Sequence, residues 1–228
     1  AAALSRRFGD NVLDATDAFS LTVTDESELE GVPEDVREAA RAAAAAAGQD
    51  GWRLTLQAPC YVPVMQLARH RPLREAMFRA YNTRASEFGP PERDNAPLMR
   101  ELLELRHEEG ALLGHDTYAH LALVPKMAGS PGEVLAFVRD LTARARPHAE
   151  REVAELRQFA ARELGLPDFQ AWDRACAAEQ LRQSRYAFSE QDLKRYFTEP
   201  RVLAGLFRLV ETLFDVAIRE DRAPLWHD

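Results

Sequence analysis

The chain has 228 residues, 46% of them hydrophobic, which is enough to bury the core of one large domain or two small ones. Its 29 basic and 37 acidic residues give a formal charge of −8. The basic side chains are dispersed beside acidic ones, which argues against a nucleic-acid partner. No apolar run approaches the roughly 20 residues of a membrane-spanning helix, and no secretory signal is visible. We therefore expect a cytoplasmic protein with no membrane partner.

The two cysteines, Cys60 and Cys176, are far apart in the sequence. They form neither a CxxC motif nor the pattern of a disulfide framework. Because no histidine lies near either of them in the sequence, we interpret both as core thiols rather than nucleophiles. Two buried thiols are typical of a protein in a reducing cytoplasm.

The first 60 residues alternate between helical and strand-like patterns. Residues 10–18 are amphipathic and read as the end of a helix. Residues 19–24 and residues 52–56 each alternate apolar and polar side chains, which is typical of half-buried strands. Between them, Pro33 favours the start of a helix and Gly48 its end. The sequence thus predicts a small two-stranded β element near the N-terminus.

From Tyr61 onward the pattern is helical, so the expected fold is mainly α. The predicted helices cover residues 72–88, 95–113, 116–121, 130–165, 172–186, 189–197 and 201–218. Ser130-Pro131-Gly132-Glu133 is a helix-start signature, with a capping hydroxyl, a first-turn proline and a glutamate three residues on. Pro147 is expected to kink or divide that helix. No internal repeat or domain boundary is visible.

One cluster of polar residues has the composition of a metal site: His107, Glu108, His115, Asp116 and His120. His107 and Glu108 belong to one predicted helix, but His115 follows the glycine that ends it. His115 and His120 are five residues apart, which does not place them on one helical face. We therefore interpret the cluster as an accidental grouping rather than a zinc site.

Several short stretches, spread over the whole chain, carry a family resemblance when they are taken in order. The longest are Asn11-Val12-Leu13-Asp14-Ala15-Thr16, Leu73-Arg74-Glu75, Tyr81-Asn82-Thr83-Arg84-Ala85-Ser86, Leu105-Arg106-His107-Glu108 and Trp172-Asp173. Shorter ones lie at residues 112–114, 118–119, 126–128, 196–197, 205–207 and 226–227. Together they resemble the thimet oligopeptidase/neurolysin family of zinc peptidases, especially its bacterial oligopeptidase A type. No single stretch is decisive, but their common order argues against coincidence.

The resemblance implies a multi-helical, neurolysin-like scaffold with a small sheet, in which two lobes enclose a channel for short peptides. In the intact enzyme, the family's zinc is held by two histidines of an HExxH motif and a downstream glutamate, and the motif glutamate activates water. This chain contains no HExxH. The nearest approach, His107-Glu108-Glu109-Gly110-Ala111, has Ala111 where the second histidine would stand. We therefore assign it no catalytic residue and no metal ligand.

Two interpretations follow from this resemblance. In the first, residues 1–228 are a single helical fragment upstream of the zinc-binding region of a cytoplasmic zinc oligopeptidase. The fragment would supply scaffold and channel wall, hold no zinc, be inactive alone and self-associate through the surface exposed by truncation. In the alternative, the chain is a stand-alone helical module that binds peptides or a protein partner.

The patch Tyr81, Asn82, Thr83 and Arg84 has two interpretations as well. Tyr81, Asn82 and Arg84 could support the channel wall or an interlobe contact. The structural alternative, which we favour, is a helix with an apolar face and a buried Arg84 paired with a glutamate. The three tryptophans, which are Trp52, Trp172 and Trp226, are interpreted as packing anchors.

Overall fold

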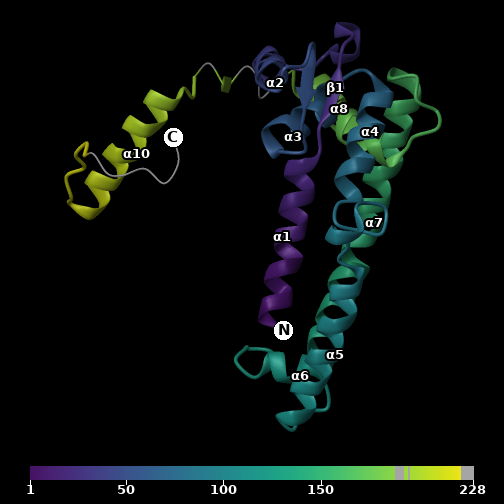
Figure 1. The fold of residues 1–228 in the computed structure, drawn as a ribbon, viewed down its shortest axis with the longest axis vertical. Helices are drawn as coiled ribbons and strands as arrows, with labels where there is room; N and C mark the ends of the chain where they lie inside the picture. The colour runs from purple at the N-terminus through teal and green to yellow at the C-terminus, as the bar shows by residue number, and fades with distance from the viewer. Residues whose placement is uncertain (188–192, 195, 222–228) are drawn as a thin grey trace. The chain divides into compact units, whose positions relative to one another are not determined.

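The computed structural model describes residues 1–187, 193–194 and 196–221 (Figure 1). The chain forms two compact units, Ala1–Leu181 and Arg182–Asp228. In chain order the elements are α1 (Ala2–Ala18), β1 (Leu21–Val23), η1 (Glu26–Leu29), α2 (Glu34–Ala46), β2 (Trp52–Leu54), α3 (Ala58–Leu67), α4 (Arg71–Asn82), η2 (Pro91–Arg93), α5 (Ala96–Leu112), α6 (Tyr118–Leu123), α7 (Pro131–Glu163), η3 (Ala171–Asp173), α8 (Arg174–Tyr186) and α10 (Glu199–Phe214). The fold is mainly α, as predicted.

The predicted sheet is confirmed as an antiparallel pair of β1 and β2. Its register places Leu21 opposite Leu54 and Val23 opposite Trp52. Because side chains alternate between the two faces of a strand, these four residues share one face. Three of them are buried and Leu21 is half-buried, whereas Arg53 lies on the other face. Helix α2 packs against β2 and covers the sheet.

The main core lies where the sheet meets α2, α3 and α4. Its most deeply buried members are Leu29, Leu54, Leu56, Val64 and Met77. Each such side chain stabilises the fold by about 1.5–3 kcal/mol relative to its exposed state. This core therefore anchors α4, the helix from which most of the polar contacts described below arise.

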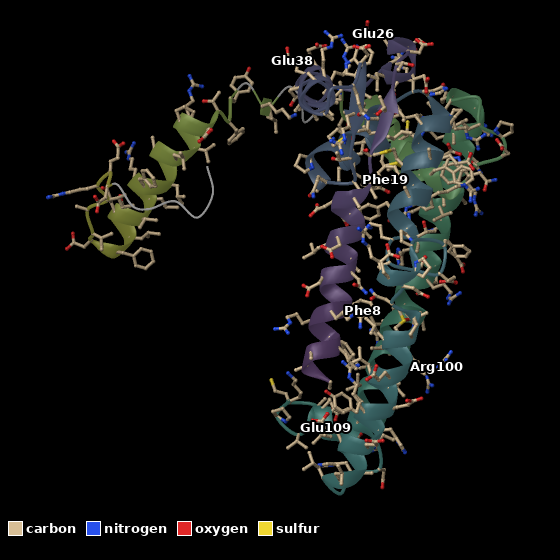
Figure 2. All side chains as sticks on the ribbon, in the orientation of Figure 1. Phe8, Phe19, Glu26, Glu38, Arg100 and Glu109 are labelled. Carbon is tan, nitrogen blue, oxygen red and sulfur yellow. The ribbon has the colours of Figure 1, made fainter. Side chains whose placement is uncertain are left out.

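Helices α1 and α5 lie side by side in the first unit and are joined at their polar residues. Asn11 of α1 donates through Nδ2 to Asn95 Oδ1 at 2.8 Å, and Asn95 Nδ2 donates to the Phe8 carbonyl at 3.0 Å. Because both amides are buried, these bonds avoid the cost of unpaired polar groups. Figure 2 shows Arg100 and Glu109 further along α5, away from the sheet.

Residues 10–18 form the end of helix α1, as predicted, and the helix begins at Ala2. Two other predicted helix limits are wrong. Helix α3 begins at Ala58, earlier than the helical pattern indicates. Helix α4 ends at Asn82 rather than residue 88, because Thr83 Oγ1 donates to the Arg79 carbonyl and Ala85 takes a φ of 49° that no helix continues.

Helix α7 begins at Pro131, as its signature predicts. Ser130 Oγ accepts the backbone N–H of Glu133 at 3.1 Å, so the predicted cap is confirmed. Of the two outcomes predicted for Pro147, a kink or a division, division is wrong because the helix continues to Glu163. Proline removes one N–H donor and crowds the preceding turn at a cost of about 3 kcal/mol, which a helix of 33 residues tolerates.

The buried part of α7 is confined to its C-terminal end. Leu156 and Ala160 pack against Ala177 of α8 and form a second, smaller core. This contact fixes the end of α7 beside α8 in the first unit.

The second unit contains α10, which was predicted over residues 201–218. The helix starts earlier, with Pro200 in its first turn, and ends where Asp215 adopts a left-handed φ of 51°. The predicted helix at 189–197 falls mostly outside the described residues, and Trp226 lies wholly outside them. Of the helices in the described part of the chain, none is both long and apolar enough to cross a bilayer.

The turn before β2 provides a test of the fold. Gly51 has a φ of +91°, and a Cβ there would lie 2.2 Å from the Val23 carbonyl oxygen. Gly48 has a φ of +67° with nothing within 4 Å. Both alanine variants carry the left-handed penalty of about 1–2 kcal/mol, but only Gly51→Ala adds a backbone clash. We expect Gly51→Ala to lose about 1–3 kcal/mol more than Gly48→Ala in urea unfolding. Equal losses would contradict the turn geometry.

Candidate functional site

A fully buried carboxylate organises the junction of α4 and η3. Asp173 is 0% exposed and accepts hydrogen bonds from Arg74 Nη2 at 2.9 Å and Arg71 Nη2 at 2.8 Å. Arg74, 2% exposed, also donates to the Ala68 carbonyl at 2.8 Å. Arg71 reaches further and pairs with the exposed Asp168 at 3.0 Å. These bonds fasten residues 168–173 to the start of α4.

The hydrogen bonds decide the charge state of Asp173. Burial by itself favours the neutral acid, but hydrogen bonds from Arg71, the Gln170 backbone N–H and Arg74 outweigh it. The pKa of Asp173 is therefore lowered from its ordinary value, and hydrogen bonding to Asp173 and Asp168 raises the pKa of Arg71. At neutral pH the network holds an ionised carboxylate between two guanidinium groups.

Beside this network lies a groove bounded by α3, α4, α7 and the segment 169–175, with a volume of about 690 Å³. We call it the α4–α7 groove. Its lining combines aromatic, apolar, amide and guanidinium groups, and none of the described residues that line it carries a carboxylate. The lining residues are Tyr61, Val62, Met65, Gln66, Phe78, Asn82, Val153, Arg157, Phe169, Gln170, Ala171, Arg174 and Ala175.

An aromatic stack supports one side of the groove. The rings of Tyr61 and Tyr81 lie 4.1 Å apart between centroids and 13° from parallel. The guanidinium carbon of Arg84 lies 3.6 Å from the centroid of the Tyr81 ring, in a cation–π arrangement. Arg84 Nη1 donates to Thr16 Oγ1 at 2.8 Å, so the stack is tied to α1.

The expected pairing of Arg84 with a glutamate is wrong. Its partners are the Thr16 hydroxyl, the Tyr81 carbonyl at 2.8 Å and the Tyr81 ring, and Arg84 is only half-buried. The cation needs no carboxylate because a ring face, two acceptors and partial exposure to water accommodate it.

Two of the three candidate support residues reach the groove or its wall. Asn82 lines the groove directly, and its Nδ2 donates to the Phe78 carbonyl at 2.8 Å. Tyr81 stacks on Tyr61, which lines the groove. Arg84 does not line the groove, but its guanidinium group lies over the Tyr81 ring and supports it.

Both cysteines, Trp52 and Trp172 contribute to packing. Cys176 is buried, as predicted, whereas Cys60 is only half-buried against the main core. Burial raises the pKa of both thiols, so both are protonated at neutral pH. Trp52 lies in the core, and Trp172 packs edge-on against Phe78 at 6.3 Å between ring centroids.

Comparison with known proteins places this architecture in a family. Residues 64–228, most of the chain, match the model of Peptidase family M3. The chain belongs to peptidase family M3. It is 44% identical to oligopeptidase A of Salmonella typhimurium over 98% of this chain and 33% of that protein. It is 33% identical to dipeptidyl carboxypeptidase of the same organism over 99% of this chain and 33% of that protein. This M3 chain thus spans about a third of the length of these relatives.

The described part of the M3 chain does not offer a zinc site. His107 and Glu108 lie on α5, and His120 lies on α6 with its Nδ1 2.9 Å from Thr117 Oγ1. Among the described residues, no three His, Cys, Asp or Glu side chains form a group that could hold a metal ion. We therefore assign no hydrolytic step to His107, Glu108 or His120.

Two of the stretches that resemble the family meet in space. Arg74 comes from Leu73-Arg74-Glu75 and Asp173 from Trp172-Asp173, 99 residues apart. No local pattern in either stretch predicts this pairing. The available signal was Arg74 itself, since a charged residue beside Leu73 and near Met77 on a buried face requires a buried partner. Arg157 and Arg174 were also missed, because they come from separate helices and show no local pattern.

The Asp173 network makes a direct prediction about stability. Asp173→Asn leaves two guanidinium groups without their shared carboxylate, so we expect it to lower the free energy of unfolding by about 3–5 kcal/mol. Asp168→Asn removes an exposed partner of the same Arg71 and should cost at most about 1 kcal/mol. Chemical denaturation of both variants measures the difference. Losses of similar size would show that the buried pair does not hold η3 on α4.

Proposed function

We propose that this chain is part of a cytoplasmic zinc-dependent oligopeptidase that hydrolyses short peptides, and that it supplies helical scaffold and channel wall. The observation that carries the proposal is the 44% identity to oligopeptidase A across 98% of this chain but only 33% of that protein. The names of the relatives describe peptidases that act on oligopeptides or remove dipeptides. The intact protein would accordingly take short peptides as substrates and zinc as cofactor.

The geometry of the described residues supports a role in the wall of the peptide channel rather than in the catalytic centre. The described residues build a groove and the Tyr61–Tyr81–Arg84 stack, but they form no group of metal ligands. In the intact enzyme, bound zinc would supply Lewis-acid activation of water. The residues of this chain would bind and orient peptide, with Asn82 at the wall and Tyr81 and Arg84 supporting it. We assign zinc binding and hydrolysis to a part of the intact enzyme outside this chain.

The proposal predicts that the isolated chain neither retains zinc nor cleaves peptides. After incubation with zinc and removal of the excess, elemental analysis should find less than one equivalent of metal. A quenched fluorescent peptide should remain intact at every zinc concentration. Stoichiometric, tightly held zinc together with hydrolysis would overturn the proposal.

Sequencing the gene beyond the Asp228 codon provides the matching control. An open frame that continues into HExxH and a downstream glutamate supports the oligopeptidase, and the longer protein should cleave the same peptide. A stop codon directly after Asp228 would contradict the fragment interpretation. The stand-alone helical binding module would then be the better description.

An exposed apolar face on α7 leads to a second prediction. Leu135, Phe137, Val138 and Leu141 expose 48–67% of their surface, and four large apolar side chains on one helix are typical of an interface. We propose that the isolated chain self-associates through this face. Its molar mass in size-exclusion chromatography with light scattering should rise with concentration.

Matched variants on α7 separate this interface from other contacts. Phe137→Glu combined with Leu141→Glu should shift the chain toward monomer, whereas Ala143→Glu, on the same exposed helix, should leave self-association unchanged. A chain that is monomeric at all concentrations would contradict self-association and favour the stand-alone module.

A further inference from the structure

Two arginines in the α4–α7 groove differ from those nearby on α4. Arg157 from α7 and Arg174 from the start of α8 both line the groove and are exposed. Among the described residues, neither forms a salt bridge. In contrast, Arg71, Arg74 and Arg79 of α4 each pair with a carboxylate. The groove therefore presents two guanidinium groups that the described protein does not neutralise.

The other residues that line the groove indicate which class of ligand could neutralise the guanidinium groups of Arg157 and Arg174. Tyr61, Phe78 and Phe169 offer aromatic surface, while Gln66, Asn82 and Gln170 carry amide groups that can both donate and accept hydrogen bonds. A ligand that satisfies all three kinds of group carries an anion, an apolar side chain and hydrogen-bonding backbone groups. A peptide with a carboxylate has this combination, and a volume of about 690 Å³ lies within the range of ligand sites.

A neighbouring hollow suggests the direction of such a peptide. It has a volume of about 440 Å³, shares Val153 and Arg157 with the groove, and continues along α7 to Glu150 and Arg146. Glu150 offsets the positive charge of Arg146 at that end, whereas no carboxylate lines the groove beside Arg157 and Arg174. This difference favours the groove end for the peptide carboxylate, with the rest of the peptide extending along α7.

We propose that the α4–α7 groove binds a peptide carboxylate through Arg157 and Arg174, with an apolar side chain of the peptide against Phe78, Phe169 and Tyr61. The inference rests on the proposed function and adds a holding site separate from hydrolysis. Guanidinium groups bind carboxylates through paired, charge-assisted hydrogen bonds, which makes them suited to this role. The carboxylate comes either from the C-terminus of a short peptide or from an acidic side chain within a longer one.

Peptide binding to the 228-residue chain tests the site. Three hexapeptides labelled with an uncharged fluorophore share an aromatic residue: one has a free C-terminus, one is C-terminally amidated, and one is amidated but carries an internal glutamate. Fluorescence polarisation at low ionic strength measures each dissociation constant. We expect the amidated peptide without glutamate to bind about tenfold or more weakly than at least one of the carboxylate-bearing peptides. The carboxylate-bearing peptide that binds tightly identifies the source of the anion.

Charge-matched variants locate the binding. Arg157→Gln with Arg174→Gln should weaken binding of the carboxylate peptide about tenfold or more, and the corresponding lysine variants should restore part of it. Arg100→Gln with Arg139→Gln removes the same charge from exposed positions outside the groove and should change the affinity little. Circular dichroism and thermal unfolding confirm that all variants are folded.

Either of two results would overturn the inference: equal affinity for all three peptides, or equal effects of the groove and control variants. These results leave the proposed function separately testable. The longer protein could prove to contain HExxH and to cleave peptides while this chain shows no carboxylate-dependent binding. That combination would contradict the peptide-holding site and support the oligopeptidase proposal.

Discussion

The buried carboxylate of Asp173 connects two segments that are remote in the sequence. Arg71 and Arg74 lie on consecutive turns of a helix anchored in the main core, and both donate to Asp173. This fastens η3 and the start of α8 to α4. The segment 169–175 supplies part of the groove wall, so the shape of the groove depends on the same contacts. A buried charge is costly unless it is fully paired, which makes this junction specific as well as strong.

The arginines around the α4–α7 groove have two different roles: some form structural ion pairs, and others are proposed to bind a ligand. Arg71 and Arg74 of α4 pair with Asp173 and hold elements together, whereas Arg157 and Arg174 have no ion-pair partner in the described part of the chain. Arg84 is intermediate, since a tyrosine ring and a threonine hydroxyl accommodate it. The difference between satisfied and unsatisfied cations distinguishes the structural network from the proposed binding surface.

The exposed length of α7 fits membership of a longer protein. A helix of 33 residues with only Leu156 and Ala160 buried gains little from packing within the described structure. Its apolar side chains are those expected of an interface, and the M3 relatives are about three times as long as this chain.

Local sequence patterns were sufficient for most of the described helices, the two strands and the cap at Ser130, because alternation, helical spacing and first-turn chemistry act over a few residues. The resemblance of short ordered stretches was sufficient for the family. Pro147 and Ala85 show that local patterns can fail even at short range. The surrounding helix continues through Pro147, and the left-handed backbone of Ala85 is incompatible with the longer helix that was predicted. Only the tertiary structure decided that Arg74 pairs with Asp173, that Arg84 rests on Tyr81 rather than a glutamate, and that Arg157 and Arg174 share one groove. These contacts join residues from different helices, and no local pattern encodes which distant side chain will supply the partner.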